Sequence, residues 1–512
     1  MSGLNLFPAN FPAGPEIFIA SMILLLMLLD AFIPAFNSGS SSFSGSSSSP
    51  NFNKKTGIYW LSQLTLIIAF ILTLSQWHGL LERSGFSHAL IIFNQQFVLD
   101  PLACLLKLAL YLLAFLSFCY GRAYNNQSKI PVAEYHLLGL LSLLGGMVLI
   151  SAHSLLTLYL GLELMSLPLY ALIAIARRRQ EGSEAAMKYF VMGAIASGLL
   201  LYGMSLIYGM AGSINLNIIS NLNLNTPDLN IGVLITGLVL VLIGMVFKLG
   251  IVPFHMWAPD VYEGSPISVT TFLSTVPKIA IFGMICRLVL QGFSHWSPVW
   301  DQVFIILGVL SVFIGNLIAL TQTNIKRLLA YSTIANMGFV LISLGMGVGE
   351  GAGNLGAQSA LLYLLIYLLT TAGAFGVLLL MSKGGLELQT IQDFKGLNKR
   401  NSWISFIFTL LLLSMAGIPP LLGFDAKLFI IFHLINLNHE YLAVFLLIMS
   451  VAASFYYLKI IKAMYFEEPS ESASPIIKSA VSFFSILSLN SLLVLILGIF
   501  PSGLFWLVSQ IF

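Results

Sequence analysis

The chain has 512 residues, of which 58% are hydrophobic and only 8% are charged, and its formal net charge is +3. A soluble globular protein would carry about 25% charged residues, so the composition excludes that class. The small net charge gives no indication of nucleic-acid binding, and we expect a lipid bilayer as the surroundings of this chain.

Apolar runs of about 20 residues recur from end to end, each long enough to cross a bilayer as a helix. The first run lacks a basic segment before it, so we interpret it as a retained helix and not as a cleaved signal peptide. A Ser/Gly-rich tract at 38–53 follows it and is typical of a flexible loop. The sequence predicts an all-α polytopic membrane protein of about fourteen spans, at residues 16–36, 58–77, 102–120, 134–151, 154–176, 185–210, 231–254, 266–290, 302–321, 328–347, 358–382, 403–433, 441–463 and 479–509.

Basic residues fall almost entirely in the loops that follow odd-numbered spans. By the positive-inside rule these loops lie in the cytoplasm, and both termini lie outside. The residues concerned include Lys54, Lys55, Arg122, Lys129, Arg177, Arg178, Arg179, Lys326, Arg327, Lys383, Lys395, Lys399, Arg400, Lys462 and Lys478.

Two spans are predicted to be discontinuous. The seventh contains Gly250 and Pro253, and the twelfth contains Gly417, Pro419 and Pro420, because proline removes a backbone donor and disrupts the turn before it. Both breaks read Gly-Ile-x-Pro and are five spans apart, so the two copies enter the membrane from opposite sides. This pattern indicates an inverted repeat with broken helices, which is common in ion-coupled transporters.

Four ionisable residues lie in the middle of apolar spans: Glu163, Lys248, Lys278 and Lys427. A charge at bilayer depth costs at least about 2.5–3.5 kcal/mol, so such residues usually face a polar path with a function. A lysine kept from water can exchange its proton near neutral pH, and a Glu–Lys pair of variable separation forms a switchable proton site. The alternative is a static buried ion pair that holds two helices together.

Further charged residues allow several interpretations. His255 follows the first break and could pass a proton onward, or could simply pack or hydrogen-bond at a helix end. Lys188 follows Glu184 by four residues, which suits an exposed helix pair, although an inward orientation makes it a secondary relay candidate. Asp30, Asp100 and Lys107 could mediate helix contacts or bind a neighbouring subunit.

The chain lacks a P-loop, a GxGxxG turn after a strand, and an HExxH motif. Its three cysteines, Cys104, Cys119 and Cys286, have no CxxC spacing. We therefore expect no ATP-driven transport, no metal site and no redox chemistry within this chain.

Several segments resemble the antiporter-like membrane subunits of respiratory complex I, and among these most closely subunit N, the counterpart of mitochondrial subunit 2. They are LGLELMSLPLYALIA, EAAMKYFVMGAIASGLLLYG, GMVFKLGIVPFHMWAPDVYEGSPISVTTFLSTVPKIAIF, LTQTNIKRLLAYSTIANMGF and LLSMAGIPPLLGFDAKL. The resemblance extends from about the third span onward. One departure is GFDAKL, where many relatives have a glycine-rich GF-x-G-K.

The resemblance implies fourteen helices with two inverted five-helix repeats, each containing a half-channel. It divides the chain into N-terminal helices (1–125), an inner half-channel (126–292), an outer half-channel (293–465) and a C-terminal helix (466–512). It also implies that Glu163 pairs with Lys248, that Lys278 connects the halves, and that Lys427 serves the outer half.

The implied function is that of a proton-translocating subunit of an NADH-quinone oxidoreductase, with no redox site of its own. FMN, iron–sulfur clusters and quinone would bind to partner subunits, and the other membrane subunits would connect this chain to the peripheral redox arm. Alternatives are a subunit of a multi-subunit cation/proton antiporter or of a membrane-bound hydrogenase, or a purely structural assembly subunit. We expect a bacterial inner membrane, with an organellar inner membrane as the alternative.

Overall fold

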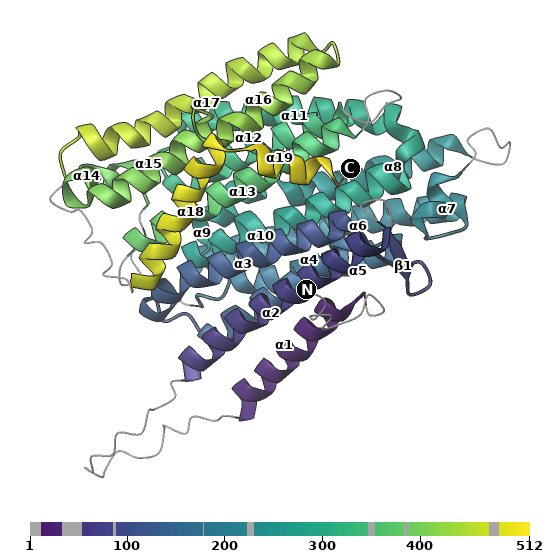
Figure 1. The fold of residues 1–512 in the computed structure, drawn as a ribbon, viewed down its shortest axis with the longest axis horizontal. Helices are drawn as coiled ribbons and strands as arrows, with labels where there is room; N and C mark the ends of the chain where they lie inside the picture. Colours follow the sequence, from purple (N-terminus) through teal and green to yellow (C-terminus); the bar gives the residue numbers. More distant parts are fainter. Residues whose placement is uncertain are drawn as a thin grey trace.

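The computed structural model describes residues 12–32, 54–84, 89–177, 179–222, 230–346, 354–382, 387, 389–469 and 481–511. The Ser-rich tract at 38–53 therefore lies outside the described residues. The described part is an assembly of long helices that run roughly alongside one another, with one small hairpin (Figure 1).

The N-terminal part contains three helices and the hairpin. They are α1 (Gly14–Phe32), α2 (Lys54–Ser84), β1 (Leu90–Ile92), β2 (Phe97–Leu99) and α3 (Pro101–Gln127). The two strands pair antiparallel, with Ile91 opposite Val98. α3 begins where the Asp100 side chain accepts a hydrogen bond from the Ala103 amide, which satisfies one of the free donors at the helix start.

The next part of the chain contains seven helices. They are α4 (Val132–Ile150), α5 (Leu155–Ile173), α6 (Gln180–Ala211), the short α7 (Leu216–Ser220), α8 (Ile231–Leu249), the short α9 (Trp257–Gly264) and α10 (Ile267–Cys286), which continues as the π-helix η2 (Arg287–Gly292). The predicted break in the seventh span is present, because α8 ends at Gly250 with φ +78°, and the next helix, α9, begins only at Trp257, beyond the predicted end of that span at 254. A left-handed residue at this position is usually glycine, since it has no Cβ to clash.

The last part of the chain contains, among its described residues, seven longer helices and several short ones. It contains η3 (Ser294–Trp296), α11 (Ser297–Thr321), α12 (Ile325–Gly345), α13 (Leu355–Met381), η4 (Ile391–Phe394), α14 (Leu397–Arg400), α15 (Ser402–Ala416), α16 (Leu422–Asn436), α17 (Glu440–Phe466), α18 (Val481–Ile499) and α19 (Ser502–Ser509). The predicted twelfth span is again broken, since α15 ends at Gly417 with φ +83° and α16 begins at Leu422.

Among the described residues, twelve helices are each long and apolar enough to cross a membrane, or up to thirteen if the bent pair at the C-terminus forms one span. The fourteen predicted spans exceed this number because α15 and α16 have only 15 residues each, so neither reaches the length of a single span. The C-terminal span also differs from a straight helix, because α18 and α19 meet at 82°.

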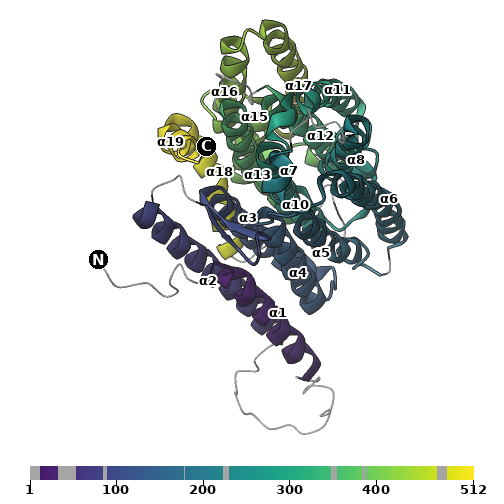
Figure 2. The ribbon, with the colours of Figure 1, turned by 90° about the vertical axis from the view of Figure 1, so that its right-hand side faces the viewer.

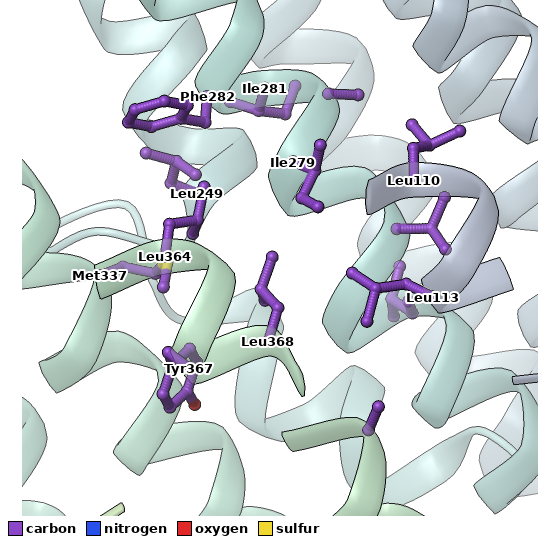
Figure 3. Packing of buried hydrophobic residues seen from close by; sticks show 14 of the residues in the cluster. Leu110, Leu113, Leu249, Ile279, Ile281, Phe282, Met337, Leu364, Tyr367 and Leu368 are labelled. Atoms are coloured by element: carbon purple, nitrogen blue, oxygen red, sulfur yellow. The ribbon is translucent and has the colours of Figure 1, made fainter. Parts of the chain in front are cut away.

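α10 lies at the centre of the bundle. All 20 of its residues are buried, and it packs against α3, α4, α5, α8 and α13. Figure 3 shows Ile279, Ile281 and Phe282 of α10 among apolar side chains from the surrounding helices, including Leu110, Leu249 and Leu364. Outer helices such as α6 and α17 instead leave large apolar side chains exposed, as expected for surfaces that face lipid.

The loops assigned to the cytoplasm meet at one end of the bundle. Glu387 forms ion pairs there with Arg179 (2.7 Å) and Lys326 (2.8 Å), and it accepts a hydrogen bond from Tyr124 near the end of α3. Asp100, at the beginning of α3, pairs instead with Arg287. Since the helix between Asp100 and Tyr124 is about 36 Å long, the two charge clusters lie at opposite ends of α3.

Candidate functional site

Lys248 is buried between α8 and α5. Its Nζ donates hydrogen bonds to the Ser166 hydroxyl (2.9 Å) and the Tyr170 hydroxyl (3.2 Å), and it lies 5.8 Å from the centre of the Tyr189 ring. Glu163, Ser166 and Tyr170 are spaced i, i+3 and i+7, so they share one face of α5. The amine of Lys248 thus contacts the helix face that carries Glu163.

Glu163 and Lys248 form no direct ion pair within 4 Å, although the structure describes both residues. The Glu163 Oε1 atom is buried and has no hydrogen-bond partner among the described residues. The two groups are therefore on a common face but separated, with Ser166 and Tyr170 holding the amine.

Lys278 lies on α10, with a side chain that is almost fully buried. Its Nζ donates a 2.7 Å hydrogen bond to the carbonyl oxygen of Leu249, the last residue of α8. The last carbonyls of a helix lack an intrahelical donor and carry the negative end of the helix dipole. The break at Gly250 thus provides the acceptor that holds Lys278 at the centre of the bundle.

Lys427, on α16, is held by the second break in the same manner. Its Nζ donates to the carbonyl oxygens of Ala416 (2.9 Å) and Met415 (3.1 Å), at the end of α15, and to the hydroxyl of Ser450 on α17 (3.0 Å). It also lies 5.6 Å from the centre of the Phe339 ring.

A network of hydroxyl and amide groups adjoins Lys427, and sequence reasoning missed it. Asn336, Tyr363 and Tyr367 line the same small cavity as Lys427. Tyr363 donates to Asn336, Tyr367 donates to Thr333 (2.9 Å), and Asn336 donates to Ser332. The sequence does contain one sign of this network, because the polar residues Ser332, Thr333 and Asn336 interrupt the apolar run that forms α12.

His255 lies in the segment between α8 and α9. It is buried, and its ring centre lies 6.4 Å from that of Tyr331 on α12. Among the described residues no hydrogen bond joins it to Lys248 or Lys278, and its Nδ1 atom has no partner.

Lys188 lies at the end of the bundle where the loops assigned to the cytoplasm meet, outside the line of buried lysines. It pairs with Glu184 (2.9 Å) and with Asp260 (3.0 Å), and its side chain is 46% exposed. Together with Glu263, Arg327 and other charged residues it lines a cavity of about 720 Å³.

Glu387 lines the same cavity and connects the segments that carry Arg179, Lys326 and Tyr124. Burial alone would raise the pKa of Glu387, but the charges of Lys326 and Arg179 outweigh burial and hold this pKa below its ordinary value. Glu387 is therefore a permanently charged anchor at neutral pH.

Two further buried ion pairs involve residues of α3 or its N-cap. Arg287 binds both carboxylate oxygens of Asp100 (2.6 and 2.7 Å) and also donates to the Ile150 carbonyl. Lys107 pairs with Glu16 at 2.5 Å and so connects α3 to α1. The sequence alone did not predict either partner, because the residues of each pair are far apart in the chain.

The fold and these buried groups define a multi-spanning membrane protein with two helix breaks. At each break, the last carbonyl groups of the helix that precedes it bind a lysine. In agreement, residues 152–453 match the family described as NADH:quinone oxidoreductase/Mrp antiporter, transmembrane. The chain is 43% identical over 499 residues to NADH-quinone oxidoreductase subunit N of Coxiella burnetii, with 97% of this chain and 98% of the relative covered. It is likewise 43% identical over 508 residues to subunit N of Thioalkalivibrio sulfidiphilus, with 98% of both chains covered.

The chain therefore belongs to the NADH-quinone oxidoreductase subunit N family. The relatives align over nearly its whole length, so the likeness includes the N-terminal helices and does not begin only at the third span, as the sequence motifs had suggested.

Solved structures support the same assignment. A chain of respiratory complex I from Thermus thermophilus superposes with a TM-score of 0.75 at 28% identity, covering 97% of this chain and 99% of that one. A chain of the Mrp complex from Dietzia sp. gives a TM-score of 0.81 at 20% identity, covering 98% and 97%, and at that identity it shows a common fold alone.

Proposed function

We propose that this chain translocates protons as a membrane subunit of an NADH-quinone oxidoreductase. The names of its relatives and its likeness to a chain of complex I support this assignment. The other membrane subunits would be its immediate partners and would connect it to the peripheral redox arm. FMN, iron–sulfur clusters and quinone would bind to those partners, and this chain would contribute no redox site.

One structural observation carries the proposal for the relay. Among the described residues, Lys248, Lys278 and Lys427 donate hydrogen bonds only to hydroxyl and carbonyl oxygens, which are neutral. The buried Lys107 and Lys326 instead form ion pairs with carboxylates. A lysine with neutral partners can lose its proton without leaving an unpaired buried carboxylate, whereas a lysine in a tight ion pair cannot.

The separated arrangement of Glu163 and Lys248 corresponds to the open state of a switch. If the Lys248 amine left Tyr170 and moved along α5, it would approach Glu163, and the new ion pair would favour the charged lysine. Quinone reduction elsewhere would drive this opening and closing, and the change would pass to Lys278 and then to Lys427, which releases its proton outside. His255 is a further candidate to pass protons between the halves, and Lys188 remains a secondary candidate at the cytoplasmic entrance.

We further propose that residues 126–292 and 293–465 form two inverted repeats. In the first, Ser154 at the start of α5 makes an antiparallel bridge with Asn215, which precedes the short α7. In the second, Asn324 at the start of α12 bridges in the same way to Thr390, which precedes the short η4. The first bridge lies on the side of the membrane with the β-hairpin and the second on the cytoplasmic side, as an inverted repeat requires.

The test is proton pumping by the assembled complex in proteoliposomes. We expect Lys248→Ala and Glu163→Ala each to lower the number of protons pumped per NADH oxidised, while subunit content stays normal. Full pumping by an assembled mutant complex would contradict the relay. Identification of the subunits that co-purify with the chain separates this function from that of an antiporter or hydrogenase subunit.

A further inference from the structure

Two adjoining depressions lie between the N-terminal helices and the C-terminal α18. The first is an apolar groove of about 460 Å³ between α2, α3 and α18, and the second is a polar pocket of about 250 Å³ between α2, α3 and α4. Tyr59, Arg122 and Asn126 line both, so the two depressions are continuous. Figure 2 shows α18 beside α3, with α2 on the other side of α3.

The groove has the character of a site for hydrocarbon. Its walls include Leu64, Ile67, Phe115, Phe483 and Ile486. Leu64 is 49% exposed and Ile67 is 43% exposed, so the groove opens toward the surroundings of the bundle, which for this fold is lipid. Its volume falls within the range of about 300–1,000 Å³ that ligand sites usually occupy.

The polar pocket carries positive charge. Lys55 and Arg122 line it, and neither depression has an acidic residue among its described lining residues. The Arg122 guanidinium lies over the Tyr59 ring (4.3 Å) and the Trp60 ring (5.6 Å), and it forms no ion pair with any described residue. Arg122 is thus positioned on an aromatic platform, with its charge available to an anion.

Two buried acceptors also face this pocket without partners. The side chains of Asn125 and His136 are each about 1% exposed, and His136 Nε2 and both polar atoms of the Asn125 side chain, the acceptor Oδ1 and the donor Nδ2, have no hydrogen-bond partner among the described residues. His136 Nδ1 lies 2.7 Å from the Val132 carbonyl and must carry the proton, since a carbonyl can only accept. Nε2 of the neutral ring is then an acceptor, so a ligand that fits must bring donor groups as well as negative charge.

We propose that these depressions bind one anionic glycerophospholipid of the cytoplasmic leaflet, whose headgroup carries hydroxyl groups. An acyl chain occupies the groove, the phosphate binds Arg122, and the headgroup hydroxyls donate to Asn125 and His136. The pocket lies at the end of α3 near Tyr124, which is the cytoplasmic end, where anionic lipids attract basic residues. A zwitterionic headgroup fits less well, because its second cation would meet two basic side chains.

Photolabelling of the intact complex in nanodiscs tests this site. The probe is phosphatidylglycerol with a diazirine on one acyl chain, and labelled peptides are identified by mass spectrometry. In the wild-type complex we expect label on peptides of α2, α3 and α18, competed by unlabelled phosphatidylglycerol but not by phosphatidylcholine. Equal competition by both lipids would overturn the proposal. Absence of label from the peptides that line the groove would also overturn it, since this result would mean that a protein segment fills the groove.

Matched variants refine the test. Arg122→Gln removes the charge and should lower labelling of these peptides about fivefold, the change expected for one cation near the membrane surface. Ala123→Phe fills the groove and should lower labelling while all charges remain. Lys129→Gln removes a basic residue beyond the same helix end, outside both depressions, and should leave labelling unchanged. Wild-type labelling in both Arg122→Gln and Ala123→Phe would contradict the site.

Discussion

The Lys278 amine donates a 2.7 Å hydrogen bond to the carbonyl oxygen of Leu249, the last residue before the break in the seventh span. Lys427 donates in the same way to Ala416, the last residue before the break in the twelfth span. A broken helix thus does more than interrupt a span, because its free carbonyls hold a lysine without a counter-carboxylate. Two breaks and two lysines form the framework of the proposed relay.

The first prediction concerns Gly417. In Gly417→Ala, the new Cβ would lie 2.7 Å from Lys427 Cδ, so the lysine must leave its acceptors, and the backbone with φ +83° adds a cost of about 1–2 kcal/mol. We expect the assembled variant to lose most of its proton pumping, measured as protons per NADH in proteoliposomes.

Gly250→Ala is the matched control for this prediction. Gly250 has a similar φ of +78°, but its Cβ would meet no atom closer than 3.6 Å, so the backbone cost is the same and no lysine is displaced. We expect Gly250→Ala to lose similar thermal stability and to keep more of its pumping. Equal pumping by the two variants would argue against the importance of the Lys427 position.

The second prediction concerns the hydroxyls that hold Lys248. The double variant Ser166→Ala, Tyr170→Phe removes two hydrogen bonds, each contributing about 1.5–3 kcal/mol when one partner is charged. We expect it to pump fewer protons per NADH, because the Lys248 amine loses the position from which it approaches Glu163. Tyr189→Phe keeps its ring beside Lys248 and removes only a hydroxyl that does not bind it, so wild-type pumping is expected there. Unchanged pumping in the double variant would show that these hydroxyls do not position a relay residue.

The third prediction concerns the dependence of stability on pH. The pKa of Glu387 is held below its ordinary value in the folded chain, so its contribution to stability is present at neutral pH and is lost as pH falls through that lowered value. Glu387→Gln leaves the buried Lys326 without its carboxylate, which should cost about 3–5 kcal/mol at neutral pH.

Thermal unfolding of the wild type and of Glu387→Gln in detergent, between about pH 7 and about pH 3, tests this point. We expect the difference in melting temperature to stay nearly constant down to the ordinary carboxyl pKa of about 4.3 and to shrink below it, as the pH approaches the lowered pKa of Glu387. A difference that already shrinks between about pH 7 and about pH 5 would mean that the pKa of Glu387 is not lowered in the folded protein.

Much of the architecture is predictable from the sequence because the membrane imposes it. Span length, the one-sided basic loops and the Gly-Ile-x-Pro breaks each have a direct physical cause, and all of them lead to a polytopic helical protein. The count of fourteen exceeded the helices long enough to cross alone because it included the twelfth span, which the break at Gly417 divides into two helices of 15 residues each. A glycine in the left-handed conformation marks that point.

The partners of the buried charges were not predictable in the same way. Nothing local connects Asp100 to Arg287 or Lys107 to Glu16, since these pairs form only when distant helices pack together. The carbonyl acceptors of Lys278 and Lys427 were equally hidden, because every residue has a carbonyl and only the fold exposes particular ones. Glu163 and Lys248, expected as a pair of variable separation, are apart in this structure, and hydroxyl groups on the same helix face hold the Lys248 amine.

The most direct test of the central claim is the proton stoichiometry of a Lys278→Ala complex. Lys278 lies on the central helix α10 and is bound to the end of α8, so a relay that crosses from one half to the other must depend on it. In proteoliposomes, with subunit content verified and NADH oxidation measured in parallel, we expect fewer protons per NADH than in the wild type. A fully assembled Lys278→Ala complex that pumps the wild-type number of protons would contradict the account.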